Sequence, residues 1–165
     1  MTRSILAVIS DLAAHVDAKD TETANQKRIE GTADRIAAVA GRGPFDDVVS
    51  AMLVQLLAQR GVQARRISYA SVSRETIAQL DLSAVQVITV SHLEIGGAPA
   101  HLRYLIGRLR HRAPHSTLIA GLWAQGDPVL NDPQAQKALG GDRYVASLRD
   151  AIDASLAALS DPSPT

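Results

Sequence analysis

The side chains best suited to contact a ligand follow the most apolar segment of the chain. Residues 85–90 form a β-branched apolar run, Ser91 and His92 come directly after it, and Gly96 and Gly97 follow. Apolar side chains on both faces are typical of a central strand that helices cover on both sides. Open α/β sheets bind their ligands at the carboxyl ends of such strands. A hydroxyl and an imidazole at that place predict a site that hydrogen-bonds a ligand or moves a proton.

A second glycine-bearing bend, Gly41 to Asp47, follows the short apolar segment 36–40. Its glycines let backbone N–H groups approach an anion where a helix begins, so Gly41, Arg42 and Gly43 join the candidate binding residues. The same turn also has a purely structural explanation. Pro44 can begin the helix, and Asp46 and Asp47 would repel phosphate while they stabilise the positive end of the helix dipole.

The other candidates have structural explanations too. Ser91 could cap backbone groups while His92 is exposed, and the sequence alone does not assign Asp11, Asp46 or Glu94 as the carboxylate partner of His92. Trp123 follows the apolar segment 117–122. Its indole could stack on a planar ligand, or it could simply cover the top edge of the sheet. The candidate ligand-binding residues are therefore Gly41, Arg42, Gly43, Ser91, His92, Gly96, Gly97 and Trp123.

Several kinds of catalytic and metal site do not fit this sequence. The chain has no cysteine, and Pro114 between His111 and His115 prevents these two imidazoles from sharing a regular helix face. No G-x-S-x-G elbow of a hydrolase is present. A phosphoacceptor receiver needs acidic residues at strand ends where this chain has Gly41-Arg42 and Ser91-His92. We therefore expect no metal site, no catalytic residues and no enzyme activity.

Length, composition and charge limit the number of domains and the kinds of partner that this protein can have. The chain has 165 residues, 46% of them hydrophobic, with 17 basic and 17 acidic side chains and a formal net charge of zero. One compact domain is the natural expectation at this length. No global field favours nucleic acid, and no apolar stretch approaches the roughly 20 residues that span a bilayer. These features predict a soluble, cytoplasmic domain that does not bind nucleic acid.

Strand-like and helix-like patterns alternate from residue 35 onward. Strands are predicted at 36–40, 62–68, 85–90, 117–122 and 144–146, with Arg65 and Arg66 placing the second at a sheet edge. Helices are predicted around an apolar stripe of Val49, Met52, Leu53, Leu56 and Leu57, from Ser73 to Leu80, and around 102–109 and 148–159. Alternation of this kind predicts a three-layer flavodoxin-like α/β fold with a five-stranded parallel sheet in the order 2-1-3-4-5. Loops 41–47 and 91–98 would then share one crevice.

The remaining segments divide the chain into four parts. Residues 1–18 predict an extra amphipathic N-terminal helix, and 19–34 read as a polar linker. Residues 35–160 form the α/β domain, and 161–165 are a tail with two prolines.

Two resemblances arise at the candidate residues. Ser91-His92-Leu93 after the third strand resembles the Ser-x-Leu motif of cobalamin-binding domains of the methionine-synthase and mutase type. That family has an Asp-x-His-x-x-Gly loop after its first strand and Gly-Gly after its fourth. This chain has Gly41 to Asp47 without a histidine, and a single glycine in Gly121-Leu122-Trp123. The resemblance implies a cobalamin-binding-like fold, but the usual histidine ligand is absent and no cofactor is expected.

The second resemblance covers about residues 35–150. The runs 42–46, 51–57, 99–105, 108–114 and 121–123 are similar to the soluble C-terminal domain of some bacterial PerM-type permeases, the autoinducer-2 exporter group. This resemblance implies a regulatory domain at the cytoplasmic face of the plasma membrane, without catalytic residues.

From these observations we expect a sensor or interaction domain with an unidentified small ligand. Its partner would be the membrane portion of a permease or a second copy, through the N-terminal helix or the Arg103–Arg112 face. A cobalamin or nucleotide-like cofactor binder and a pure oligomerisation module are the alternatives.

Overall fold

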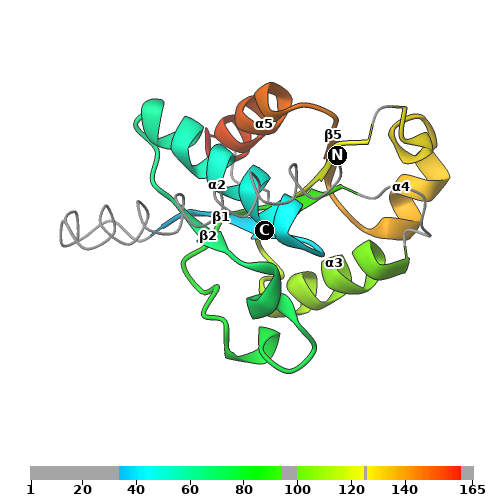
Figure 1. Cartoon of the computed structure of the whole chain (residues 1–165), viewed down its shortest axis with the longest axis horizontal. Helices are drawn as coiled ribbons and strands as arrows, with labels where there is room; N and C mark the ends of the chain where they lie inside the picture. The colour runs from blue at the N-terminus through cyan, green and yellow to red at the C-terminus, as the bar shows by residue number, and fades with distance from the viewer. Residues whose placement is uncertain (1–33, 94–99, 125, 161–165) are drawn as a thin grey trace, which may run out of the picture. The chain divides into compact units, whose positions relative to one another are not determined.

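A five-stranded parallel sheet forms the middle of three layers (Figure 1). The computed structural model describes residues 34–93, 100–124 and 126–160. Its strands are β1 (Ile36–Ala40), β2 (Ala64–Ile67), β3 (Val87–His92), β4 (Thr117–Leu122) and β5 (Arg143–Val145). They lie in the order β2-β1-β3-β4-β5, and every neighbouring pair is parallel. The predicted flavodoxin-like order is confirmed, and β1 and β3 are adjacent at the point where the order reverses.

Two helical layers cover the sheet. The helices are α2 (Pro44–Gln59), α3 (Ala100–Arg112), α4 (Pro133–Leu139) and α5 (Leu148–Ser160). Leu53 and Leu57 of α2 pack with Ile152 of α5 on one face, and Leu105 of α3 packs with Leu139 of α4 on the other. Figure 1 shows the same division, with α2 and α5 on one side of the sheet and α3 on the other.

The central strands are buried on both faces, as their composition predicts. Ile36 and Ala38 face the α2/α5 layer, while Ala37 and Val39 face the α3/α4 layer. All residues of β1, β3 and β4 are buried. The arginine-bearing β2 lies at the sheet edge, as expected.

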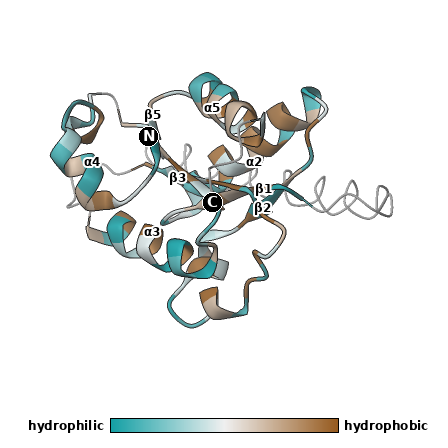
Figure 2. Ribbon diagram, turned by 180° about the vertical axis from the view of Figure 1, so that it is seen from behind, coloured by the Kyte–Doolittle hydropathy of each residue, from teal (hydrophilic) through white to brown (hydrophobic). Residues whose placement is uncertain are grey.

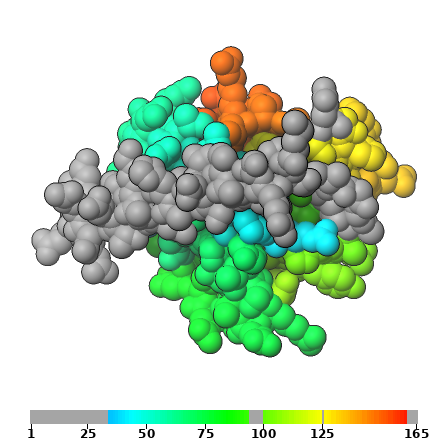
Figure 3. Space-filling model, viewed as in Figure 1, coloured from blue at the N-terminus to red at the C-terminus, as the bar shows by residue number. Residues whose placement is uncertain are grey.

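The connection between β2 and β3 differs from the predicted helix Ser73–Leu80. It consists of two 3-10 turns, Tyr69–Val72 and Ile77–Gln79. The Ser73 hydroxyl accepts a hydrogen bond from the Thr76 amide at 3.3 Å, and such local side-chain bonds compete with a longer helix. Val72 and Ile77 bury their side chains in the core on the α3 side. In the space-filling view this green segment forms the lower edge of the visible face (Figure 3).

Some predicted boundaries were wrong. The second strand is shorter than 62–68, and β5 begins one residue before the predicted 144. β3 begins at Val87 because the Val85 amide turns back to the Leu82 carbonyl, and the strand continues through Ser91 and His92, which pair with Gly121 and Leu122. Ser91 and His92 therefore belong to the strand and not to the loop after it.

The predicted apolar stripe of α2 was also partly wrong. Met52 is 45% exposed, and the side chains that face the sheet are Asp46, Ser50, Leu53 and Leu57. Their spacing of four, three and four residues keeps them on one side of the helix.

Other predictions fall on residues outside the described ranges. These are the N-terminal helix 1–18, the linker up to residue 33, Gly96, Gly97 and the tail 161–165. Among the described helices, none combines the length and apolarity that a membrane span requires.

Candidate functional site

The bends after β1 and β3 meet at their first residues. The Gly41 amide donates a hydrogen bond to the Ser91 carbonyl at 2.9 Å. A Cβ at Gly41 would lie 2.7 Å from that carbonyl oxygen and 3.3 Å from Nδ1 of His92. Only glycine permits an approach this close. The two segments meet at their described residues, and the crevice predicted between loops 41–47 and 91–98 stays a prediction.

The carboxylate of Asp46 joins the two bends. Oδ2 accepts the Arg42 amide at 2.8 Å, and Oδ1 accepts the Leu93 amide, 47 residues away in sequence, also at 2.8 Å. The side chain is 2% exposed. We call Asp46, with the amides of Arg42 and Leu93, the Asp46 clamp. From the sequence, Asp46 was expected to stabilise the helix dipole and was one of three unassigned carboxylates for His92. Its spacing from Ser50, Leu53 and Leu57 is the signal that could have placed it on a buried stripe.

Burial dominates the electrostatics of the clamp. It raises the pKa of the Asp46 carboxyl, and the hydrogen bonds from Leu93 and Arg42 and the charge of His92 only partly oppose it. His92 is 3% exposed, so the alternative of an exposed imidazole is wrong. Asp46 is thus the acidic group that the sequence alone could not assign to His92.

Ser91 is fully buried on the α2/α5 side of the sheet. Thr89, two residues earlier and on the same face, shares a hydrogen bond of 3.1 Å with Ser155 of α5. The Ser91 hydroxyl has no hydrogen-bond partner among the described residues, so the backbone-capping explanation is not supported. The hydroxyl of Ser50, on the sheet-facing stripe of α2, is buried in the same way.

Trp123 lies one strand further along, against Gly121. Cζ2 of the indole lies 2.1 Å from the position that a Cβ on Gly121 would take. The side chain packs against the core of the α2/α5 layer, and its Nε1 is buried with no hydrogen-bond partner in the described part of the chain. The indole therefore covers the end of the sheet at Gly121.

His101 is a site residue that the sequence analysis missed. From the first turn of α3, its Nε2 lies 3.0 Å from the Gly41 carbonyl oxygen. The amide of Gly41 is held by β3 and its carbonyl by α3, so this residue connects the sheet to the α3 side. No local pattern marks His101 as different from the other histidines.

The structure thus brings Gly41, Arg42, Gly43, Ser91 and His92 together, with Trp123 beside them. Arg42 is exposed, and a Cβ at Gly43 would meet nothing within 4 Å. Arg42 is the exposed residue of the site and Gly43 is half-buried, while the carboxylate, imidazole and hydroxyl are buried. Within the described ranges, no three His, Asp or Glu side chains are placed to hold a metal ion. This arrangement is suited to linking two bends, because the amides of Gly41 and Arg42 are already bonded to Ser91 and Asp46.

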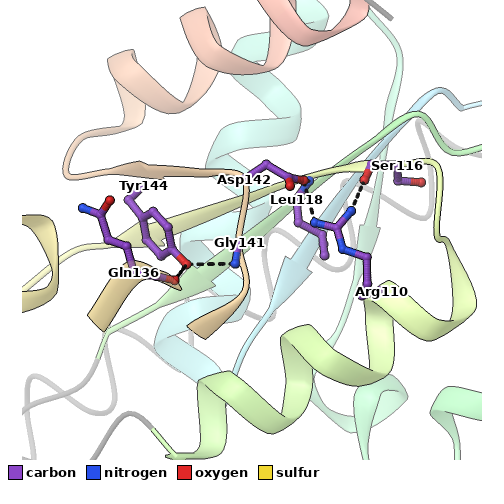
Figure 4. A network of polar contacts seen from close by, with 7 residues as sticks. All are labelled: Arg110, Ser116, Leu118, Gln136, Gly141, Asp142 and Tyr144. Carbon is purple, nitrogen blue, oxygen red and sulfur yellow. Dashed lines mark hydrogen bonds and ion pairs between the residues drawn. The ribbon is translucent and has the colours of Figure 1, made fainter. Parts of the chain in front are cut away.

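The predicted basic face of α3 is only partly an outer surface. Arg110 donates to the Ser116 carbonyl at 2.9 Å and pairs with Asp142 at 2.7 Å, which in turn accepts the Leu118 amide (Figure 4). Arg112 donates to the Leu80 carbonyl at 2.7 Å. Two of the arginines therefore hold neighbouring segments in place.

No protein-family model and no curated protein matches this sequence. Solved structures do resemble the fold. A putative pilus assembly-related protein from Burkholderia pseudomallei is 16% identical, with a TM-score of 0.55 over 84% of this chain and 98% of that one. A putative pilus assembly protein (cpaE) from Burkholderia thailandensis is 19% identical, with a TM-score of 0.52 over 76% of this chain and 98% of that one.

A cobalamin-binding protein from Desulfitobacterium hafniense has a similar fold as well. It is 12% identical, with a TM-score of 0.54 over 74% of this chain. This chain spans 58% of the length of that protein. At these identities the three likenesses establish the flavodoxin-like, cobalamin-binding-like fold and nothing finer.

Proposed function

We propose that this chain is a non-enzymatic regulatory or interaction domain that serves a bacterial membrane transporter of the PerM type from the cytoplasmic side. Its candidate ligand site is the Arg42-Gly43 backbone at the carboxyl ends of β1 and β3. The observation that supports this role is the Asp46 clamp, which joins two separate bends through one buried carboxylate. A carboxylate and an imidazole buried beneath the bends favour a linking role over reaction with a substrate. The transporter part rests on the resemblance of residues 35–150 described above.

The clamp gives the domain a route from its surface to both helical layers. The bend after β1 leads into α2 at Pro44, and His101 at the start of α3 contacts the carbonyl of Gly41. Asp46 already accepts the Arg42 amide, so a ligand or partner that binds the Arg42 and Gly43 backbone would compete with this carboxylate. The competition would change the position of Asp46 and the strength of its bond to Leu93. The response then reaches α2 directly and α3 through His101.

Thermal unfolding with small-molecule probes tests the ligand part. We would measure the full chain, Gly43→Val and Ser91→Leu with nucleotides, dicarboxylates and sugar phosphates, and use the exposed Met52→Val as the control variant. Gly43→Val has room for its side chain and blocks access to the backbone, so it is the cleaner variant. We expect at least one probe to raise the Tm of the wild type and of Met52→Val but not of the other two. A wild type that responds to no probe, or equal responses in all four proteins, contradicts the ligand part.

The transporter part has a separate test. A permease encoded in the same gene or beside it, whose membrane portion co-purifies with this domain from solubilised membranes, supports the assignment. A genomic neighbourhood without a permease removes it and leaves the ligand part untouched.

One protein of similar fold, from Desulfitobacterium hafniense, binds cobalamin. The residues of this chain do not fit that cofactor. The bend Gly41 to Asp47 has no histidine, and the Trp123 indole occupies the space over Gly121. Gel filtration after incubation with hydroxocobalamin checks this directly. We expect no visible absorbance to co-elute with the protein.

A role as an oligomerisation module is favoured by one observation. Residues 48–59 of α2 contain no charged side chain, and Phe45 and Met52 are 44% and 45% exposed. Uncharged outer faces of this kind are typical of protein contacts. Light scattering of the wild type, of Met52→Glu and of a chain lacking residues 1–30 tells whether α2, the N-terminal segment or neither holds copies together.

A further inference from the structure

The carboxyl end of the sheet carries a row of small residues on its α2/α5 side. Ala40 pairs with Ser91, and Ser91 pairs with Gly121, across three neighbouring strands. The preceding row on the same face consists of Ala38, Thr89 and Ile119. Thr89 is larger than Ser91 and Ile119 is larger than Gly121, and Thr89 is bonded to Ser155. We call the space above these three small residues, on the side of the sheet that α2 and α5 cover, the recess.

Trp123 fills this recess at Gly121. It lies two residues after Gly121, and its indole folds back over that glycine, with Cζ2 and Cη2 at 2.1 and 2.4 Å from the site of a glycine Cβ. Glycine is required there because any side chain would displace the ring.

The polar groups beside the recess are unsatisfied. Ser91 and Ser50 are both 0% exposed, and neither hydroxyl has a hydrogen-bond partner among the described residues. The buried Nε1 of Trp123 lacks one in the same part of the structure. Native proteins pair nearly all buried polar atoms. An unpaired indole Nε1, beside an unpaired hydroxyl on the residue that pairs with Gly121, indicates that the indole fills this space by shape without meeting its hydrogen-bonding potential.

We propose that Trp123 is an internal occupant of a ring-binding recess formed by Ala40, Ser91 and Gly121, and that the domain admits a flat heteroaromatic ring there only when the indole leaves. The Trp123 indole therefore takes the position over Gly121 that the ring of a ligand would otherwise occupy. The proposal does not depend on the Asp46 clamp or on any transporter.

The wild-type protein offers a direct reporter, because Trp123 is the only tryptophan. We expect acrylamide to quench its fluorescence several-fold less efficiently in the folded full chain than in the urea-unfolded chain. Gly121→Ala should expel the ring, which would raise the quenching constant and shift the emission to the red. The matched control is Gly107→Ala in α3, where a Cβ meets nothing within 4 Å, and it should leave both values unchanged. An unchanged emission in folded Gly121→Ala overturns the proposal.

Chemical rescue tests the recess itself. Trp123 is half-buried and packs against the core of the α2/α5 layer. Removing its ring leaves a space that small aromatic molecules can fill, so we expect free indole to raise the Tm of the full-length Trp123→Gly variant by several degrees. Indole should not stabilise the wild type or Tyr104→Ala, which loses an aromatic ring that is 63% exposed. If Trp123→Gly does not fold, Trp123→Ala and the quenching experiment carry the test. A folded truncation variant that indole does not stabilise overturns the proposal.

Discussion

The two helical layers of this domain distribute polar residues in opposite ways. On one side, α3 buries Leu102, Leu105, Ile106 and Leu109 and exposes Arg103 and His111. On the other side, the buried stripe of α2 begins with Asp46 and Ser50 and ends with Leu53 and Leu57, while its outer face is largely apolar. Figure 2 shows the contrast, with brown over much of α2 and teal patches along α3.

The polar residues in the buried stripe of α2 lie at the candidate site, and α3 has no equivalent among its buried residues. An ordinary surface helix buries an apolar stripe and exposes charge, as α3 does. α2 departs from this pattern in two ways. Residues 48–59 expose no charge, and the buried stripe is polar in the first turns, where Asp46 bonds to Leu93 after β3. Departures from local rules concentrate where a site or a strained contact needs them. The polar and apolar halves of α2 should therefore have separate roles, the first in joining the bends and the second in packing the core.

The largest expected effect concerns the apolar half of α2. Leu53 is fully buried, whereas its neighbour Met52 is 45% exposed. We expect Leu53→Ala to lower the free energy of unfolding by about 2–5 kcal/mol through loss of burial and a new cavity. Met52→Ala should change it by about 0.5 kcal/mol or less. Urea denaturation of both variants measures the difference, and equal losses would contradict the assigned stripe.

The next effect concerns the polar half. Asp46→Ala leaves the amides of Arg42 and Leu93 without their acceptor, so we expect a loss of about 2–3 kcal/mol. The matched control is Asp132, whose exposed carboxylate accepts the amides of Gln134 and Ala135 at the start of α4. Asp132→Ala should cost about 1 kcal/mol, as for other helix caps. Faster hydrogen exchange of the Leu93 amide in the Asp46 variant alone would confirm that the clamp joins the two bends.

Burial of Asp46 also makes stability depend on pH. Because burial raises its pKa above that of the unfolded chain, the folded state binds the proton more tightly. The stability linked to this proton is present in acid and is lost as the pH rises through the raised pKa. We therefore expect the stability of the wild type relative to Asp46→Asn to fall as the pH rises above the ordinary aspartate pKa of about 4 and through the raised pKa. Urea titrations at a series of pH values measure it, and a constant difference would contradict the burial.

A smaller effect is expected in the opposite layer. The Tyr144 hydroxyl donates to the Gln136 carbonyl at 2.6 Å and accepts the Gly141 amide at 2.8 Å, which ties α4 to β5 (Figure 4). We expect Tyr144→Phe to cost about 1–2 kcal/mol at neutral pH. Burial raises the pKa of Tyr144, so this advantage of the wild type should persist until the pH rises through that pKa. A variant as stable as the wild type at pH 7 would show that the contact contributes nothing.

The sequence allowed much of the fold to be predicted and little of the site. β1 and β4 were placed at their observed residues because continuous apolar runs between turns identify strands buried on both faces. The Asp46 clamp was missed because its second partner, Leu93, is distant in sequence, and a carboxylate near a helix start has a local explanation. The position of Trp123 over Gly121 depends on a side-chain rotamer that no sequence pattern encodes. The binding role of Gly41, Arg42, Gly43, Ser91 and His92 stays a prediction.

The smallest effect separates two hydroxyls on the same strand. Thr89 shares a hydrogen bond with Ser155, whereas the Ser91 hydroxyl has no partner among the described residues. Removing one member of a buried pair costs about 1 kcal/mol, so Thr89→Val should destabilise the domain by that amount. Ser91→Ala deletes a hydroxyl that is desolvated without compensation, and it should leave stability unchanged or raise it by about 1 kcal/mol. If Ser91→Ala is instead the more damaging variant in urea denaturation, its hydroxyl has a partner, such as bound water, and the space beside Trp123 is better satisfied than its protein contacts indicate.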